Sequence, residues 1–279
     1  MYNFDCVIIG SGIAGMTAAI YLKRANLNVL ILDNDAPGGL LNKVKKIENY
    51  PGFISITGPE LAYKVYEQVQ NLDIEIKYGK VLSIDDHIIK TDIEQISANK
   101  IIIATGRQAK KLENTDNISN ISYCTVCDAN LYKDKVVGII GTENSTEDVL
   151  YLSNICKKVI FISQNQINYD FSNENIELND LCVINTLTKE NGKITTIVTN
   201  KGEFSIDGVF VSMGYEPKMD FLDKISKENG YIVVNDNMQT NIDYIYACGD
   251  CVKKDIYQIT TAVSDATIAA INVKKTLNN

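Results

Sequence analysis

The first 33 residues contain a glycine-rich turn between two apolar segments, and this pattern constrains the fold more than any other part of the chain. An apolar run at residues 6–9 leads into GSGIAG at residues 10–15, which is followed by a segment of helical periodicity. A second apolar run ends at Asp33, 18 residues after Gly15. This separation is close to the value of about 20 residues between such a turn and its acidic partner. The order strand, glycine turn, helix, strand and acid predicts a βαβ unit.

Each glycine of this turn has a physical role in binding a dinucleotide. Gly10 allows the tight turn out of the strand, Gly12 lets the backbone approach a pyrophosphate, and Gly15 lets the helix pack closely on the strand. The pyrophosphate then faces the unpaired N–H groups at the start of the helix. Asp33 accepts hydrogen bonds from the ribose hydroxyls. The pattern predicts a dinucleotide site, and the alternative is a glycine-containing turn without a ligand.

The same periodicity restarts in the middle of the chain. KVVGII at residues 135–140 reads as a buried strand, followed by the turn GTENST at 141–146, a helix and the strand KVIFI at 158–162. The sequence therefore predicts an α/β fold with two nested Rossmann-like (three-layer ββα) nucleotide-binding domains, the second inserted in the first. We place the discontinuous first domain at residues 1–110 and 240–279, and the inserted domain at residues 111–239.

The inserted domain contains, near its start, a Cys-x-x-Cys pair, Cys124 and Cys127, followed directly by Asp128. Two cysteines at this spacing close a small disulfide that exchanges with another thiol pair. Asp128 is then a candidate to relay a proton to or from a thiolate, and its alternative is a turn or capping residue. A zinc site would need two more ligands, and the single histidine, His87, is distant in sequence. Two buried structural cysteines are the remaining alternative. We predict no metal.

Composition excludes several classes of function. Lys plus Arg number 27 and Asp plus Glu number 35, giving a net charge of −8, which argues against nucleic acid or an anionic membrane as partner. No run of 18 apolar residues occurs, and the N-terminus reads as a strand rather than a signal peptide. The cysteine count of seven is odd and irregularly spaced, unlike a secreted disulfide framework. We therefore expect a cytoplasmic protein.

Five motifs follow one another along the chain: GSGIAG, GG with ENYPG, ATG, CxxCD, and GD before the C-terminal helix. They occur in the order seen in one family, and the chain resembles the low-molecular-weight thioredoxin reductases over nearly its whole length. The resemblance implies FAD as cofactor, thioredoxin as partner and a homodimer. It implies that Cys127 sits over the flavin and that Cys124 attacks the thioredoxin disulfide, with Asp128 as the acid. Leu40 replaces the usual Gln after the two glycines. The implied FAD contacts are Gly10, Gly12, Gly15, Asp33, Gly39, Asn49, Thr105, Gly106, Gly249, Asp250, Gln258 and Ile259.

The second glycine turn departs from the family pattern. Glu143 stands where a glycine lets phosphates approach, and Thr146 where a small residue lets helix and strand pack. The family's His-Arg-Arg cluster, which clamps a 2′-phosphate, is replaced by SQN at residues 163–165, and no arginine follows Arg107. We therefore expect the inner cleft to be closed to a nicotinamide nucleotide. In lacking both motifs the chain resembles the ferredoxin-dependent flavin thioredoxin reductases, which implies reduced ferredoxin as electron donor.

Other functions stay open at this point. One is an NAD(P)H-dependent thioredoxin reductase with a degenerate nicotinamide site. Another is an oxygen-dependent dithiol oxidase, and a third is a flavin-bearing redox sensor. A second Cys-x-x-Cys, Cys248 and Cys251, brackets the Gly249-Asp250 pair, and we interpret its cysteines as packing residues. Candidate lysines for docking an acidic ferredoxin are Lys43, Lys45, Lys46, Lys110 and Lys111.

Overall fold

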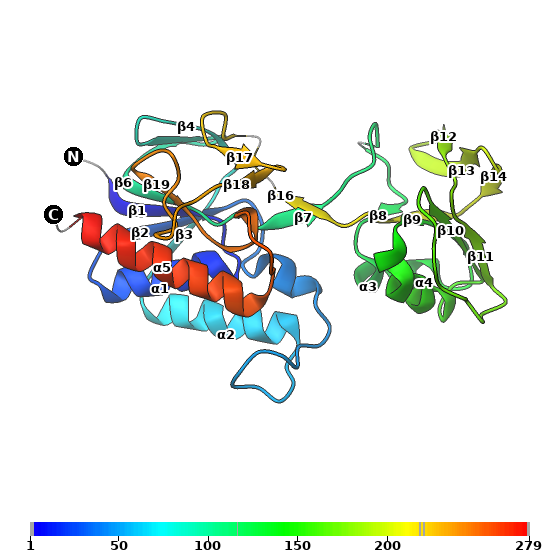
Figure 1. The fold of residues 1–279 in the computed structure, drawn as a ribbon, viewed down its shortest axis with the longest axis horizontal. Helices are drawn as coiled ribbons and strands as arrows, with labels where there is room; N and C mark the ends of the chain where they lie inside the picture. Colours follow the sequence, from blue (N-terminus) through cyan, green and yellow to red (C-terminus); the bar gives the residue numbers. More distant parts are fainter. Residues whose placement is uncertain (1–2, 116, 218, 220, 278–279) are drawn as a thin grey trace. The chain divides into compact units, whose positions relative to one another are not determined.

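The computed structural model describes residues 3–115, 117–217, 219 and 221–277, and the chain forms two compact units (Figure 1). The outer unit comprises Met1–Gln108 and Pro217–Asn279, and the inserted unit comprises Ala109–Glu216. Each unit contains a parallel sheet with helices, so the predicted α/β fold of two nested Rossmann-like domains is confirmed.

The boundaries differ from the sequence prediction, chiefly at the second crossing. We placed residues 217–239 in the inserted domain, but they belong to the outer unit. Met219, Leu222 and Ile232 are buried in the same apolar cluster as Val7 of the first strand. Burial of these side chains against the outer sheet, rather than any local pattern, assigns the segment.

The outer unit is built on a seven-stranded sheet. Strands β2, β1, β6 and β19 run parallel, with β3 parallel to β2 at the edge. Strand β6 belongs to two pairings, because its first residues pair antiparallel with β5 and its later residues pair with β1. The strands are β1 (Phe4–Ile9), β2 (Val29–Asp33), β3 (Glu75–Tyr78), β4 (Val81–Asp85), β5 (Ile88–Thr91), β6 (Gln95–Ile103) and β19 (Ile245–Ala247).

Three helices cover one face of this sheet: α1 (Ile13–Arg24), α2 (Gly58–Asn71) and α5 (Ile259–Leu277) (Figure 1). Ile8 of β1 and Leu22 of α1 are fully buried in the core on this side. Helix α2 begins at Gly58, because Thr57 and Glu60 form a reciprocal capping box before it. This layer fixes the start of α1, and with it the first glycine turn.

The opposite face of the outer sheet carries a second apolar core. Val7 and Ile9 point to this side, so β1 is buried on both faces, as a central parallel strand requires. Strands β4 and β5 and the small hairpin of β17 (Lys227–Glu228) and β18 (Tyr231–Ile232) lie on this side (Figure 1). The outer unit thus has the three layers that the sequence predicts.

The inserted unit has a five-stranded, entirely parallel sheet in the order β11-β10-β9-β15-β8. A three-stranded antiparallel sheet, β12-β13-β14, completes it. Its strands are β8 (Ile121–Ser122), β9 (Val136–Gly141), β10 (Lys158–Ser163), β11 (Ile176–Asn179), β12 (Ile184–Glu190), β13 (Lys193–Thr199), β14 (Gly202–Ser205) and β15 (Gly208–Ser212), and its helices are α3 (Thr125–Asp128) and α4 (Thr146–Ser153).

The remaining elements are short. Strands β7 (Arg107–Ala109) and β16 (Tyr215–Pro217) pair with each other where the chain passes between the units. The 3-10 helices are η1 (Gly39–Lys43), η2 (Ala129–Tyr132), η3 (Glu143–Ser145) and η4 (Gly249–Cys251). None of the helices within the described ranges combines the length and apolarity needed to cross a membrane.

Candidate functional site

The first glycine turn connects β1 to α1 in the way that the sequence predicts. Gly10 has a φ of 108°, and a Cβ there would stand 2.4 Å from the carbonyl oxygen of Ala104. A Cβ on Gly15 would stand 1.9 Å from the carbonyl oxygen of Gly10. Both positions therefore require glycine for the packing of the turn itself.

Gly12 differs from its two neighbours because the space in front of it is open. No heavy atom of the described residues lies within 4 Å of the place a Cβ would take, and the same holds for Gly106. Around Gly39 the Cα of Gly12 lies 3.5 Å from that place. Gly12 also forms a bridge with Gly38 of the Gly38-Gly39 pair. These bare backbone positions leave room for a pyrophosphate and thus fit the FAD that the sequence resemblance implies.

Asp33 ends β2 beside the first turn. Its Oδ2 accepts hydrogen bonds of 2.5 Å from both the backbone N–H and the hydroxyl of Ser11. Its Oδ1 accepts from the backbone N–H groups of Asn34 and Asp35. The carboxylate thus holds the glycine turn in place. Sequence reasoning missed Ser11, although its position between two glycines of the motif was a usable signal.

A second group of predicted residues comes together from distant parts of the chain. The side-chain amide of Asn49 donates a 3.2 Å hydrogen bond to Oε1 of Gln258, which directly precedes α5. Ile259 begins that helix and packs against the apolar cluster around Leu41. The structure therefore brings Asn49, Gln258 and Ile259 to one place, at the start of α5.

The turns after β6 and β19 form the third part of the site. Thr105 and Gly106 follow β6, and the backbone nitrogen of Thr105 lies close to Gly10. Gly249 and Asp250 follow β19, and the backbone N–H of Gly249 donates to Asp265 of α5. Strands β6 and β19 are parallel neighbours, so these two turns lie at the same edge of the sheet.

Arg107 is a residue of this region that sequence reasoning did not assign. Its Nη2 donates to Oδ2 of Asp250 over 2.9 Å, and both side chains are 21% exposed. Its guanidinium carbon lies 4.4 Å from the centroid of the Tyr257 ring. Lys254 pairs with Asp265 nearby. The position of Arg107 directly after Gly106 was the only sequence signal for it.

The cysteines of the second Cys-x-x-Cys are buried in the outer unit. The thiol of Cys251 donates to the carbonyl oxygen of Cys248 over 3.2 Å, and both residues are free thiols. Burial raises the pKa of Cys251 to about 11 and also raises the pKa of Cys248. Both groups stay protonated at neutral pH and are therefore poor nucleophiles. This agrees with the interpretation of both cysteines as packing residues.

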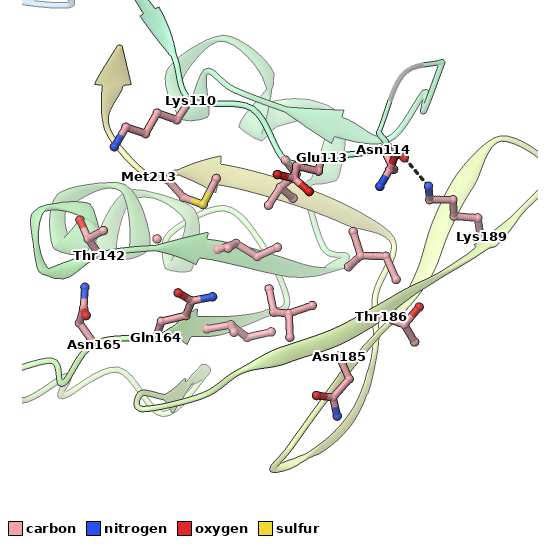
Figure 2. Close-up of a pocket in the computed structure, with 16 residues that line it drawn as sticks. Lys110, Glu113, Asn114, Thr142, Gln164, Asn165, Asn185, Thr186, Lys189 and Met213 are labelled. Atoms are coloured by element: carbon pink, nitrogen blue, oxygen red, sulfur yellow. Dashed lines mark hydrogen bonds between the residues drawn. The ribbon is translucent and has the colours of Figure 1, made fainter. Parts of the chain in front are cut away.

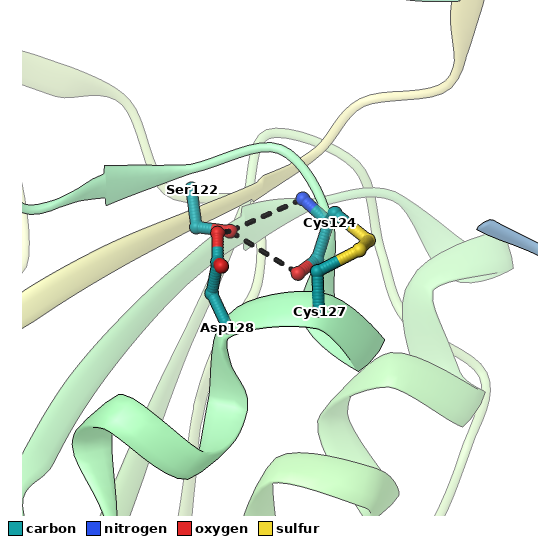
Figure 3. Close-up of a disulfide and its surroundings, with 4 residues drawn as sticks. All are labelled: Ser122, Cys124, Cys127 and Asp128. Atoms are coloured by element: carbon teal, nitrogen blue, oxygen red, sulfur yellow. Dashed lines mark hydrogen bonds between the residues drawn. A yellow bond between two sulfur atoms is a disulfide. The ribbon is translucent and has the colours of Figure 1, made fainter. Parts of the chain in front are cut away.

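The first Cys-x-x-Cys forms a disulfide in the inserted unit (Figure 3). The Cα atoms of Cys124 and Cys127 are 5.3 Å apart. Cys124 immediately precedes α3, a single helical turn in which the N–H groups of Cys127 and Asp128 both donate to its carbonyl oxygen. Cys124 is half-buried, whereas Cys127 is exposed.

Asp128 is held from the strand that precedes the disulfide. The hydroxyl of Ser122, at the end of β8, donates a 2.8 Å hydrogen bond to its Oδ2 (Figure 3). Burial raises the pKa of Tyr132, and the negative charge of Asp128 adds to the increase. Ser122, like Arg107, was not identified from the sequence.

The second glycine turn contains its own hydrogen-bond partners. The Ser145 hydroxyl accepts from the N–H of Thr142 over 2.9 Å and donates to the carbonyl oxygen of Ser212 over 2.6 Å. The Thr146 hydroxyl donates to the carbonyl oxygen of Glu143, and the Glu143 residue itself is exposed. The turn therefore stabilises itself through short side chains, and Glu143 points toward solvent rather than into the fold.

Space remains beside this turn. A pocket of about 620 Å³ lies in the inserted unit, at the carboxyl ends of β9, β10 and β15 (Figure 2). Gly141 pairs with both Ser163 and Ser212, so the three strands end together and leave space beyond them. Thr142, Gln164 and Met213, which follow those strand ends, line the pocket.

The wall of the pocket combines apolar and polar side chains and has little positive charge. Gln164 and Asn165 stand where the sequence resemblance implies arginines, and Asn185 and Thr186 lie on β12 (Figure 2). The cations in its wall are Lys110 and Lys189, and the ammonium of Lys189 donates to the carbonyl oxygen of Asn114. Glu113 adds a negative charge. No arginine occurs in the inserted unit, because the two in the chain are Arg24 and Arg107.

Comparison with known proteins places this geometry in a family. Residues 4–266 match the family model described as pyridine nucleotide-disulphide oxidoreductase. The thioredoxin reductase of Bacillus subtilis is 34% identical over 296 residues, covering 97% of this chain and 94% of that protein.

Two solved structures are similar over almost the whole chain. The thioredoxin reductase of Lactococcus lactis has a TM-score of 0.85 and 35% identity, with 98% of each chain covered. A ferredoxin-flavin thioredoxin reductase from Clostridium acetobutylicum has a TM-score of 0.58 and 32% identity, covering 99% of this chain and 98% of that one. The chain therefore belongs to the pyridine nucleotide-disulphide oxidoreductase family and, within it, to the thioredoxin reductases, and it binds FAD.

Proposed function

We propose that this thioredoxin reductase receives its electrons from reduced ferredoxin rather than from NADPH. The observation that carries the proposal is the chemistry of the pocket at the ends of β9 and β10. It offers the neutral side chains of Gln164 and Asn165 where a 2′-phosphate would need guanidinium groups. The similarity to the ferredoxin-flavin thioredoxin reductase of Clostridium acetobutylicum supports the same donor.

Residues of the outer unit would hold the cofactor. Following the family pattern, Gly12 and Gly39 would take the pyrophosphate, Asp33 a ribose and Asp250 the ribityl chain. The other implied contacts are Gly10, Gly15, Asn49, Thr105, Gly106, Gly249, Gln258 and Ile259. FAD bound there would supply the two-electron reduction of the Cys124–Cys127 disulfide.

The protein's own cysteines carry out the exchange with thioredoxin. The Cys124 thiolate attacks the thioredoxin disulfide, forming a mixed disulfide and releasing one thioredoxin thiolate. The Cys127 thiolate then attacks Cys124, which releases the second thioredoxin thiolate and restores the Cys124–Cys127 disulfide. Asp128 takes the proton of the Cys124 thiol as it becomes the nucleophile, and two protons end on reduced thioredoxin.

The proposal extends to the cellular compartment of the protein, its oligomeric state and its contact with ferredoxin. The five other cysteines are free and buried, as expected of a chain kept in the reducing cytoplasm. We propose a homodimer from the family resemblance. Lys43, Lys45 and Lys46 follow the Gly38-Gly39 pair and are exposed, and Lys46 pairs with Glu48 over 2.8 Å. These lysines and Lys110 and Lys111 are the candidates for contact with an acidic ferredoxin.

A nicotinamide nucleotide is the second candidate donor, and the size of the pocket favours it. Its volume of about 620 Å³ lies within the range of about 300–1,000 Å³ that small-molecule sites occupy. Lys110 supplies a positive charge in its wall. A site of this kind suits NADH better than NADPH, because no guanidinium is present in the inserted unit to clamp a 2′-phosphate.

Anaerobic reduction of the FAD-loaded protein distinguishes the two donors. We expect reduced ferredoxin to bleach the flavin absorbance within the time of turnover, while NADPH and NADH leave it unchanged. The thioredoxin reductase of Bacillus subtilis, handled identically, serves as the comparison protein. Rapid bleaching by NADPH or NADH, with none by ferredoxin, would reject the proposal.

A further inference from the structure

The hydroxyl of Ser122 connects the redox disulfide to its neighbouring acid (Figure 3). Ser122 is 3% exposed. Its Oγ lies 2.8 Å from Oδ2 of Asp128, 3.1 Å from the backbone nitrogen of Cys124 and 3.2 Å from the carbonyl oxygen of Cys124. A single buried side chain therefore touches both the first cysteine and the acid of the Cys-x-x-Cys-Asp motif.

The hydrogen-bonding capacity of a hydroxyl decides how these contacts are shared. It accepts the N–H of Cys124, but its single proton is donated to only one acceptor at a time. The carboxylate is the nearer acceptor, and bonds to ionised groups are about twice as strong as bonds between neutral groups. The proton therefore points to Asp128.

The backbone around Ser122 is fixed independently of the disulfide. Ser122 lies on β8, which pairs in parallel with β15 through Ile121 and Val209, and Ser122 and Phe210. Helix α3, in contrast, is a single turn of four residues, Thr125–Asp128. Such a turn has little stability of its own. When the sulfur–sulfur bond opens, the contacts from Ser122 remain to hold Cys124 and Asp128 in place.

We propose that Ser122 is a positioning residue for the thiol–disulfide exchange: its hydroxyl holds the Asp128 carboxylate in register with the backbone of Cys124. The inference rests on the proposed function in one respect, the role of Asp128 as the group that takes the Cys124 proton. It adds a residue outside the Cys-x-x-Cys-Asp motif that prepares this acid for each turnover.

The test measures reduction of thioredoxin by the pre-reduced protein over pH 5–9. This chain contains no tryptophan, so the fluorescence of a tryptophan-containing thioredoxin reports the exchange without background and without an electron donor. The FAD-loaded variants are Ser122→Ala, Ser122→Thr, Asp128→Asn and the Ser122→Ala/Asp128→Asn double variant. Thermal unfolding of each variant reports the purely structural contribution.

We expect Ser122→Ala to slow the exchange by about tenfold, because the acid and the first cysteine lose their common hydrogen-bond partner. Ser122→Thr retains the hydroxyl and keeps the wild-type rate. In the Asp128→Asn background, Ser122→Ala slows the exchange no further, because the acid it positions is gone.

Two results overturn the inference. One is an unchanged exchange rate in Ser122→Ala, whether or not its unfolding temperature falls. The other is an equal slowing by Ser122→Ala with and without Asp128. Failure of the proposed role of Asp128 is recognised separately, because Asp128→Asn alone would then leave the exchange rate as it is in the wild type.

Discussion

Nη2 of Arg107 lies 2.9 Å from Oδ2 of Asp250, which is 143 positions away in the sequence. Arg107 directly follows the Thr105-Gly106 turn, and Asp250 belongs to the turn after β19. The pair therefore ties together two turns at the edge of the outer sheet. The Tyr257 ring packs on the guanidinium and restricts its position further.

The first prediction concerns the stability of this pair. Arg107→Ala should lower the free energy of unfolding by about 1–2 kcal/mol, because it leaves a partly buried carboxylate without its donor. The free energy of unfolding of Arg107→Lys should lie between those of the wild type and Arg107→Ala, because an ammonium keeps the charge but loses the planar contact. Urea unfolding at saturating FAD measures the free energy of unfolding of both variants.

As a matched control, Lys77→Ala removes an exposed ion pair with Glu94 and should change stability by less than about 1 kcal/mol. Equal effects of Arg107→Ala and Lys77→Ala would contradict the prediction.

The second prediction separates cofactor binding from folding within one turn. Gly12→Ala should leave the unfolding temperature of the apoprotein unchanged, because its Cβ meets no atom within 4 Å. The same variant should weaken FAD binding by at least about tenfold, because the methyl group occupies the approach to the pyrophosphate. Gly15→Ala should instead destabilise the apoprotein, since its Cβ would stand 1.9 Å from a carbonyl oxygen. Flavin fluorescence titration and circular dichroism distinguish the two variants. Normal FAD affinity in Gly12→Ala would place the cofactor elsewhere.

The third prediction assigns the redox chemistry to one cysteine pair. Cys124→Ser and Cys127→Ser should each reduce thioredoxin turnover by more than about a hundredfold, because neither variant can complete the exchange. FAD content should stay as in the wild type. Cys182→Ala, which alters a buried free thiol of the same unit, should retain most of the activity. Turnover by a Cys124→Ser variant near the wild-type rate would mean that the chain reduces its partner through another group.

The fourth prediction restores the missing nucleotide contacts. The triple variant Glu143→Gly, Gln164→Arg and Asn165→Arg should bind NADPH at least about tenfold more tightly than the wild type, because guanidinium groups pair with phosphate bidentately. Isothermal titration calorimetry measures the affinity. Glu143→Gln alone, which removes only the charge, should have a smaller effect. If the wild type already binds NADPH as tightly as the triple variant, the neutral residues after β10 are not what limits the site.

The fifth prediction follows from the buried thiol of Cys251, whose pKa burial raises from 9.0 to about 11. Between these values the unfolded chain has lost the thiol proton while the folded chain retains it, so stability falls as pH rises through this window. The unfolding temperature of the wild type should therefore drop more steeply between pH 9 and pH 11 than that of Cys251→Ala. Identical slopes would show that the thiol does not contribute.

The local elements of the fold were predictable because short-range patterns specify them. The turn at residues 10–15 joins a strand to a helix as predicted, and α2 begins at Gly58 because Thr57 and Glu60 cap it. The cysteine spacing likewise predicted the disulfide between Cys124 and Cys127, which the structure contains. In each case the information lies within a few neighbouring residues.

Tertiary structure alone decided which distant groups meet. Asn49 bonds to Gln258 and Arg107 to Asp250 because parallel strands bring their turns to one edge, which no local periodicity encodes. Residues 217–239 joined the outer unit through burial of side chains such as Leu222. The pocket beside β9 stayed open although its motif is altered, because the length and register of three strands, rather than the identity of Glu143, set the space beyond their ends.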